Sequence, residues 1–416
     1  MATLTRSAFG TALLVLSLST AQAGVVTDHG RLKAQGNQIV DTNGVPFQVA
    51  GMSLYWSIWG GQNYYNRNVV DTLSQGWNAT VVRAATAGTR NGTGADKGFM
   101  YDSAGTVAKA KAVIDAAIAD DIYVIVDWHE DSANNYKHWD RAYNYFSVIA
   151  QAYGDKPNVI FEIWNEPQSI KWDTVRNYAT RVLPAIRQFS NNLVVVGTTT
   201  WSQDVDTAAK RPVSDPNVAY TLHFYACTHG HSLIKRANNA RAAGIPLFIT
   251  EFGLSPSDGG SPAKNNYRIC TDSATFWLDW ADSNQISWAN WSLSDKGESS
   301  AAIDSTNKDY TGNWPDNALS ASGKWIKARL RARTTPSSVR RVSDAAGFLP
   351  SFGASAEGLE IRLPQGTRRA ELIDLAGRIL STSSSDRLPL PGRVSGVHWV
   401  RWTDATGLHS ASIAMP

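Results

Sequence analysis

One short apolar run, residues 159–163, limits more than any other feature what this chain can fold into. The run is rich in β-branched and aromatic residues and is too short for a helix, which is typical of a strand buried on both faces. Asn165 and Glu166 follow it, and Pro167 ends it. A parallel α/β barrel builds its active site at the carboxyl ends of such strands, although Asn-Glu-Pro could also be only a turn.

A second run, residues 246–253, repeats this design and argues against a simple turn. It is an apolar strand that carries one carboxylate, Glu251, close to its end and before a glycine. Two glutamates at strand ends suggest that Glu166 and Glu251 form a pair. A pair of carboxyl groups facing one substrate is the minimum equipment for glycoside hydrolysis, in which one donates a proton and the other is the nucleophile or the base.

Six further short apolar runs alternate with helical patterns along the chain: residues 47–53, 79–84, 122–129, 193–197, 219–225 and 286–291. With the two runs above they make eight strands that end in acidic, basic or aromatic residues. This pattern predicts the α/β class and a (β/α)8 TIM barrel. Residues 24–45 combine turn glycines with alternating apolar residues, which predicts a hairpin that closes the bottom or edge of the barrel.

The sequences Ile-Trp-Asn-Glu-Pro at 163–167 and Ile-Thr-Glu-Phe-Gly at 249–253 resemble glycoside hydrolase family 5. This is a clan A family that contains many endo-β-1,4-glucanases (cellulases), and the resemblance covers about residues 40 to 330. It implies that Glu166 is the proton donor and Glu251 the nucleophile, that the anomeric configuration is retained, and that no cofactor takes part. The two carboxyl groups should then lie about 5 to 5.5 Å apart.

The residues that support these glutamates are expected at the ends of the same and of other strands. The resemblance implies that Asn165 hydrogen-bonds the 2-hydroxyl of the sugar under attack and that Tyr225 hydrogen-bonds the nucleophile. His129 should bind sugar hydroxyls, unless it is a structural histidine. Arg83 ends its predicted strand, where a cation would keep the nucleophile ionised; the alternative is a surface arginine.

Substrate contacts are expected from the loops. Tyr55 and Trp56 follow the first strand in an aromatic loop suited to stacking on sugars, and Trp201 lies in the loop after residues 193–197. Trp291, on the last strand, is expected to form the floor of the substrate cleft. Lys296 and Glu298, in the loop that follows this strand, are expected to make polar contacts with the substrate. The alternative is that they form an exposed ion pair with each other.

Three histidines, His223, His229 and His231, raise the question of a zinc site. No helical His-Glu-x-x-His spacing or fixed carboxylate ligand accompanies them. The segment instead resembles the family motif His-Phe-Tyr-Ala-x-Thr-His, with Cys227 at its variable position. We therefore expect no metal and place His223 beside the substrate, on the same side of its strand as Tyr225.

Charge and composition favour a neutral carbohydrate ligand. The net charge is only +3, which suggests neither nucleic acid nor an anionic membrane as a partner. The 16 tryptophans exceed ordinary usage, and flat indole rings stack on sugar faces, although core packing is the alternative for more than half of them. The expected partner is a β-glucan polysaccharide, cellulose or a related polymer, and the expected state is a monomer.

The first 23 residues read as a secretory signal peptide. Arg6 precedes the apolar run 12–18, and Ala-Gln-Ala at 21–23 is a small-residue cleavage site. The run is shorter than the roughly 20 apolar residues that a membrane span needs, so we expect a secreted or cell-surface protein without a membrane span. In an exported chain the only two cysteines, Cys227 and Cys270, can form a disulfide, with two buried thiols as the alternative.

A change in composition divides the chain. We expect a catalytic domain at 24–333, a polar linker at 334–346, and a small β-sandwich-like module at 347–416, where short runs alternate. Residues 369–378 resemble the C-terminal sorting modules of some Gram-negative secreted proteins. An accessory carbohydrate-binding module is the rival, and two tryptophans, Trp399 and Trp402, lie in it.

Taken with the resemblance, these features predict a secreted, retaining endo-β-1,4-glucanase that hydrolyses internal bonds of cellulose and related β-glucans with two glutamates. The same glutamates would serve another family 5 β-glycanase, namely a mannanase, a xyloglucanase or a xylanase, because loops decide the specificity. A non-catalytic carbohydrate-binding barrel is the rival from a different class.

Overall fold

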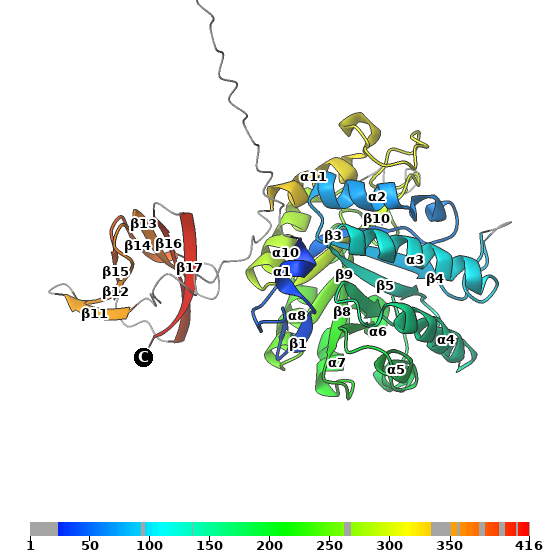
Figure 1. The fold of residues 1–416 in the computed structure, drawn as a ribbon, viewed down its shortest axis with the longest axis horizontal. Coiled ribbons are helices and arrows are strands. Elements are labelled where there is room, and N and C mark those ends of the chain that lie inside the picture. Colours follow the sequence, from blue (N-terminus) through cyan, green and yellow to red (C-terminus); the bar gives the residue numbers. More distant parts are fainter. Residues whose placement is uncertain are drawn as a thin grey trace, which may run out of the picture.

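The computed structural model describes residues 24–92, 96–134, 136–261 and 268–333, and then 351–355, 358–373, 379–390, 396–404 and 407–415 (Figure 1). The predicted signal peptide and the predicted linker, residues 334–346, lie outside the described residues. None of the described helices is long and apolar enough to cross a membrane.

Eight parallel strands close into a barrel in the order β10-β3-β4-β5-β6-β7-β8-β9. They are β3 (Ala50–Leu54), β4 (Val81–Ala87), β5 (Tyr123–His129), β6 (Val159–Glu162), β7 (Val194–Val196), β8 (Val218–Tyr225), β9 (Leu247–Gly253) and β10 (Ser287–Leu293). Each of the eight predicted apolar runs overlaps one of these strands. The predicted (β/α)8 TIM barrel is therefore confirmed.

Helices connect the strands on the outside of the barrel (Figure 1). They are α2 (Arg67–Asp71), α3 (Ser103–Ala119), α4 (Tyr136–Tyr153), α5 (Trp172–Arg187), α6 (Thr199–Ser202), α7 (Val205–Lys210), α8 (His231–Ala242), α10 (Thr271–Ser283) and α11 (Ala321–Ala332), with short helical turns η1 (Gly61–Tyr64), η2 (Thr72–Gly76) and η3 (Asp316–Ala318). Side chains cap some of them: Asp102 accepts the Gly105 N–H before α3, and Ser320 accepts the Gly323 N–H before α11. Such caps satisfy backbone donors that the first helical turn leaves free.

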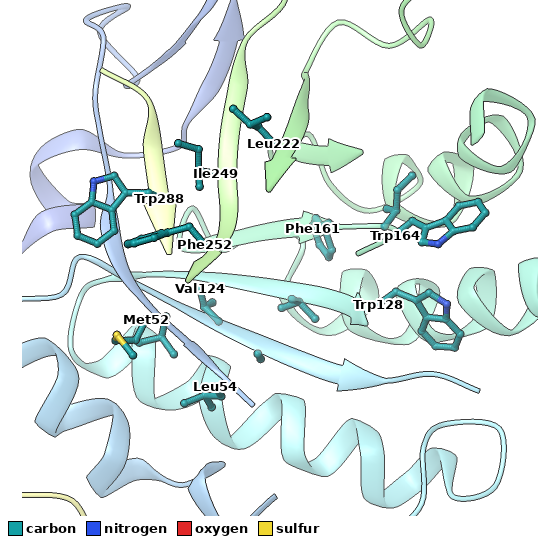
Figure 2. Close-up of a cluster of buried hydrophobic side chains, with 14 of the residues drawn as sticks. Met52, Leu54, Val124, Trp128, Phe161, Trp164, Leu222, Ile249, Phe252 and Trp288 are labelled. Atoms are coloured by element: carbon teal, nitrogen blue, oxygen red, sulfur yellow. The ribbon is translucent and has the colours of Figure 1, made fainter. Parts of the chain in front are cut away.

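Alternation along the strands sorts side chains into an outer and an inner set. Met52, Val124 and Trp128 belong to the outer set and pack in the core beneath the helices (Figure 2). The inner set faces the barrel axis, because successive residues of a strand point to opposite faces. The inner residues therefore decide what the barrel interior contains.

The bottom of the barrel is apolar and closed. The hairpin β1 (Lys33–Gln35) and β2 (Gln38–Val40), with the short helix α1 (Val25–His29), covers this end, as predicted. Leu32 and Ile39 from this segment pack in one cluster with inward-facing Val81 and Ile125 of the barrel. Water is thereby kept from the lower interior, so polar groups above this layer must be satisfied by one another.

Beyond residue 350 two antiparallel sheets form, in line with the predicted β-sandwich-like module. One has the order β11-β12-β15 and the other β14-β13-β16-β17. The strands are β11 (Ser351–Ser355), β12 (Gly358–Arg362), β13 (Arg369–Ile373), β14 (Ile379–Ser383), β15 (Arg387–Pro389), β16 (Gly396–Asp404) and β17 (Gly407–Met415). Ile361 and Leu388 of the first sheet share a hydrophobic cluster with Leu372, Val400 and Trp402 of the second.

Candidate active site

Arg83 is the centre of a buried ionic layer above the apolar bottom of the barrel. Its Nε donates to Glu162 Oε2 at 2.8 Å, its Nη1 to Glu251 Oε2 at 3.1 Å and its Nη2 to Asn165 Oδ1 at 2.6 Å. Its Nη2 also lies 2.9 Å from Asp127 Oδ2. The side chain is 0% exposed and lies inside β4 rather than at its end. The predicted strand-end position and the surface alternative are therefore both wrong, although Arg83 does contact Glu251.

Glu251, on β9, is held by two donors. Tyr225 Oη donates to its Oε1 at 2.7 Å, and Arg83 holds its Oε2. Burial raises the pKa of Glu251 to about 7, while His223, Arg83 and the Tyr225 hydroxyl oppose that rise. Because both donors stabilise the charged form, Glu251 is the glutamate that ionises first.

Glu166 lies in the loop after β6, with 17% of its side chain exposed. Its Oε1 is 2.8 Å from His223 Nδ1. Burial and the nearby charge of Asp131 raise the pKa of Glu166 to about 8. One carboxylate oxygen of Glu166, one of Glu251 and one ring nitrogen of His223 all lie within 4.8 Å of one another. The structure therefore brings the two strand-end glutamates together with different proton affinities.

His129 is fixed at the end of β5 as a neutral ring. Its Nδ1 donates to Asp127 Oδ2 at 2.6 Å, because a carboxylate oxygen accepts. Its ring stacks on Trp291 at 4.9 Å and meets the edge of Trp56 at 4.2 Å. Burial and the Arg83 charge hold the pKa of His129 well below its usual range. With Nδ1 used as a donor, Nε2 keeps a lone pair that can accept from a hydroxyl.

Three predicted aromatic residues gather on one side of the site. Tyr55, Trp56 and Trp291 belong to one apolar cluster, and the rings of Tyr55 and Trp291 lie 5.4 Å apart. Lys296 Nζ donates to Tyr55 Oη at 3.1 Å and pairs with Glu298 Oε2 at 2.9 Å. The ion pair considered in the sequence therefore exists, and it joins the last loop to this aromatic wall.

Trp201 does not belong to this aromatic cluster and lines a hollow. A cavity of about 360 Å³ is bordered by Asp131, Ser132, Asn134, Trp164, Gln168, Ser169, Ile170 and Trp201. The Trp201 side chain is exposed, and the residue's backbone N–H donates to the carbonyl of Pro167, next to Glu166, at 2.9 Å. An exposed indole is thereby attached to the loop that carries Glu166.

Within the part of the chain that the structure describes, the three predicted histidines do not gather at one point. His229 Nδ1 accepts the Tyr225 N–H at 2.8 Å, and His231 packs against Phe276 with ring centres 4.7 Å apart. Glu166, His223 and Glu251 are close enough to bind an ion, but both ring nitrogens of His223 already have protein partners. Arg83 also occupies a Glu251 oxygen, so a cation there would meet a guanidinium.

Cys227 and Cys270 form the expected disulfide, with their Cα atoms 5.3 Å apart. The bond joins the segment after β8 to the residue before α10. The loops that follow the strands of Tyr225 and Glu251 are thereby linked.

Four site residues were missed in the sequence: Asp127, Glu162, Thr250 and Asp131. Glu162 gave a usable signal, since it stands inside a run predicted to be buried on both faces, where a charge needs a partner. Asp127 gave the same signal. Nothing in the sequence marks Thr250 or Asp131, because their importance lies in contacts with distant segments.

The chain is similar to proteins of known classification. The family model described as "Cellulase (glycosyl hydrolase family 5)" matches residues 40–297, which include all eight barrel strands. Endoglucanase Z of Dickeya dadantii (strain 3937) is 40% identical over 329 residues, covering 78% of this chain and 70% of that protein. An endoglucanase of Clostridium saccharobutylicum is 38% identical over 327 residues, covering 76% and 68%.

Solved structures show the same likeness. The catalytic domain of Thermobifida fusca endoglucanase Cel5A (E5) matches with a TM-score of 0.68 and 30% identity, over 74% of this chain and all of that one (100%). A structure from Cytophaga hutchinsonii matches with a TM-score of 0.69 and 38% identity, over 74% of this chain and 96% of that one.

Proposed function

Because the chain belongs to the cellulase family of glycosyl hydrolases, family 5, we propose that it is a secreted, retaining endo-β-1,4-glucanase acting on cellulose and related β-glucans. The observation that carries the proposal is the pair Glu166 and Glu251, whose oxygens approach within 4.8 Å in unlike surroundings. Inverting enzymes separate their carboxyl groups by about 6.5 to 9.5 Å to admit a water molecule. The shorter approach supports direct attack by one glutamate.

In the first step Glu251 attacks the anomeric carbon. The bond from that carbon to the glycosidic oxygen breaks, its electron pair stays on the oxygen, and Glu166 supplies the proton that this oxygen needs. Arg83 and Tyr225 hold Glu251 in position, and Asn165 is fixed by Arg83 through its carbonyl oxygen. The Asn165 amide nitrogen donates one N–H to Asp131 Oδ1 at 3.5 Å, and its second N–H can donate toward a sugar hydroxyl.

In the second step Glu166, now ionised, takes a proton from water. The water oxygen attacks the anomeric carbon from the side that the leaving group vacated, and the bond to Glu251 breaks. Activity should rise as pH passes the pKa of Glu251, about 7, and fall as pH passes the pKa of Glu166, about 8. The nucleophile must be charged and the acid must hold its proton.

The aromatic residues fit a chain of neutral sugars. Tyr55, Trp56 and Trp291 form a wall on one side, and Trp201 offers an exposed indole beside the loop of Glu166. Aromatic faces on more than one side of the scissile bond suit an internal stretch of polymer rather than one terminal sugar. This favours endo action.

Two variants test the assignment. Glu166→Gln and Glu251→Gln should each lower kcat on soluble β-glucan by at least about a thousandfold, because each role needs an ionisable carboxyl. The acid variant should regain activity on aryl glycosides whose leaving groups need little protonation. Substantial activity of either variant on the polymer would refute the two-glutamate mechanism.

The substrate is tested separately from the mechanism. Reducing-sugar release from carboxymethylcellulose, barley β-glucan, mannan, xyloglucan and xylan should be greatest on the first two. A preference for mannan, xyloglucan or xylan would leave the mechanism intact and replace the glucanase assignment by the corresponding alternative. Release from none of the polymers would favour the non-catalytic barrel.

We also propose the division into a catalytic domain at 24–333 and an accessory or sorting module at 347–416, following a signal peptide at 1–23. Trp402 belongs to the hydrophobic core cluster that the two sheets share, so packing accounts for its ring. This supports a sorting role over binding of insoluble cellulose by that residue. Location of the protein in culture fluid, envelope and cytoplasm fractions of its host tests the secretion; a cytoplasmic enzyme would refute it.

A further inference from the structure

Two fully buried residues, Thr250 on β9 and Glu162 on β6, lie next to the active site without a role in the two-glutamate mechanism. Both side chains are 0% exposed, so neither can touch a substrate. Yet both belong to a chain of hydrogen bonds that begins at Glu166. Buried polar groups are costly unless they are paired, which makes the direction of each bond informative.

The chain of bonds runs through His223. His223 Nδ1 lies 2.8 Å from Glu166 Oε1, and His223 Nε2 lies 2.9 Å from Thr250 Oγ1. Thr250 Oγ1 in turn donates to Glu162 Oε1 at 2.7 Å. Both ring nitrogens of His223 therefore have one partner each. For each of these three hydrogen bonds, one of the two atoms must carry the proton.

The donor of each hydrogen bond can be assigned by starting from Glu162. Arg83 donates to both oxygens of Glu162, at 2.8 and 3.3 Å, which is the geometry of an ionised carboxylate. Burial raises the pKa of Glu162, and the charge of Arg83 opposes that rise. An ionised Glu162 can only accept, so the single proton of Thr250 points to it.

The Thr250 oxygen must then accept from His223, which places a proton on Nε2. Burial lowers the pKa of His223 to about 4, so the ring is neutral and carries only one proton. Its Nδ1 consequently presents a lone pair to Glu166. Only a protonated Glu166 can complete that bond, because an ionised carboxylate would face the lone pair with another.

We propose that Thr250 and Glu162 are positioning residues that fix the Nε2–H tautomer of His223, so that its Nδ1 accepts the proton of Glu166 and keeps this glutamate in its acid form. The proposal rests on the proposed role of Glu166 as the proton donor. When substrate binds, the O–H of Glu166 turns from His223 to the glycosidic oxygen. A bond that is made only to the neutral acid opposes its ionisation.

The test replaces the hydroxyl of Thr250 while keeping its shape. In Thr250→Val the Nε2 proton loses its acceptor, and the other tautomer gains a partner by donating from Nδ1 to an ionised Glu166. The basic limb of the kcat/KM–pH profile on soluble β-glucan should move to lower pH by about one unit. Thr250→Ser keeps the hydroxyl and should restore the wild-type limb.

Other charges near the acid stay unchanged in these variants. Glu166 and His223 are faced by Arg83 from β4, Asp127 from β5, Asp131 from the loop after β5, Glu162 from β6, His229 from the loop after β8 and Glu251 from β9. Neither Thr250→Val nor Thr250→Ser replaces any of these side chains, and Glu162 keeps both bonds from Arg83 in either variant. A shift seen only in the valine variant is therefore assigned to the lost hydroxyl.

The tautomer can be observed directly in the wild-type chain. Two-bond ¹H–¹⁵N correlation spectra of histidine-labelled protein, with His223 assigned by the loss of its signals in His223→Gln, should show a proton on Nε2 and none on Nδ1. A proton on Nδ1, an unmoved basic limb in Thr250→Val, or a serine variant that behaves like valine would each overturn the proposal. If Thr250→Val does not fold, the wild-type spectrum alone decides.

Failure of this inference differs from failure of the proposed function. If Glu166→Gln is active, the assignment of Glu166 as the proton donor is wrong, whatever tautomer of His223 the spectrum shows. An inactive Glu166→Gln together with a proton on Nδ1 of His223 would keep the mechanism and remove only the positioning role of Thr250 and Glu162.

Discussion

Replacing Arg83 by lysine should both unfold the protein at a lower temperature and disable it. The guanidinium makes six polar contacts, which reach Ser53, Asp127, Glu162, Glu251 and Asn165. A lysine ammonium has only three donors, so about half of these contacts are lost and at least one buried carboxylate is left without a partner.

The size of the effect follows from the burial of the cluster. Breaking a buried ion pair by removing one partner costs about 3 to 5 kcal/mol, because the remaining charge is left desolvated. With an unfolding entropy of about 2.1 cal/mol/K per residue, each kcal/mol lowers the melting temperature of a domain spanning 24–333 by roughly 1.5 °C, which gives a fall of roughly 5 to 8 °C. The orientation of Glu251 and Asn165 is lost as well, and kcat/KM should fall by about a hundredfold or more.

Thermal melts followed by circular dichroism, together with hydrolysis of soluble β-glucan, measure both effects. Arg181→Lys is the matched control, because Arg181 pairs with Asp140 at 2.8 Å while both side chains are more than half exposed. That variant should melt within about 2 °C of the wild type. If Arg83→Lys also melts within about 2 °C, the buried carboxylates do not depend on the guanidinium and the reasoning is refuted.

Two further predictions concern the acid and the domain boundary. Asp131→Asn removes a charge that raises the pKa of Glu166, so the basic limb of the kcat/KM–pH profile should move to lower pH; an unmoved limb would contradict this. A chain ending at Arg333 should keep full activity on soluble β-glucan, whereas one ending at Leu330 should melt lower, because Arg333 pairs with Asp282 at 3.0 Å and lies over the ring of Trp288. Loss of activity in the longer chain would mean that the C-terminal module belongs to the same folding unit.

Much of the barrel could be read from local pattern. The apolar runs at 122–129 and 159–163 are short, β-branched and bounded by breakers, and this information is contained in neighbouring residues. Strand boundaries moved by only a few residues, because burial on both faces requires apolar side chains along a whole strand. Glu166 and Glu251 were found for the same reason, since each stands where such a run ends.

The sequence left open every question that depends on distance. The sequence did not decide whether Cys227 and Cys270 form a disulfide or remain two thiols. The fold brings their Cα atoms to 5.3 Å, and they form the disulfide. Trp201 was expected, like Tyr55 and Trp56, to contact substrate, but it does not belong to their cluster and borders a hollow with Asp131. Positions in different loops have no fixed spacing along the chain, so only the closed barrel sets their separation.

What the sequence by itself determined is therefore the set of strands and the two carboxyl groups that they present, because both follow from the order of apolar and polar residues along the chain. Only the tertiary structure decided that Arg83 lies inside its strand, bound to Glu162 and Glu251. It alone also placed the Thr250 hydroxyl between His223 and Glu162. The physical reason is that the charge and proton position of a buried group are set by its neighbours in space, which here come from separate strands of the barrel.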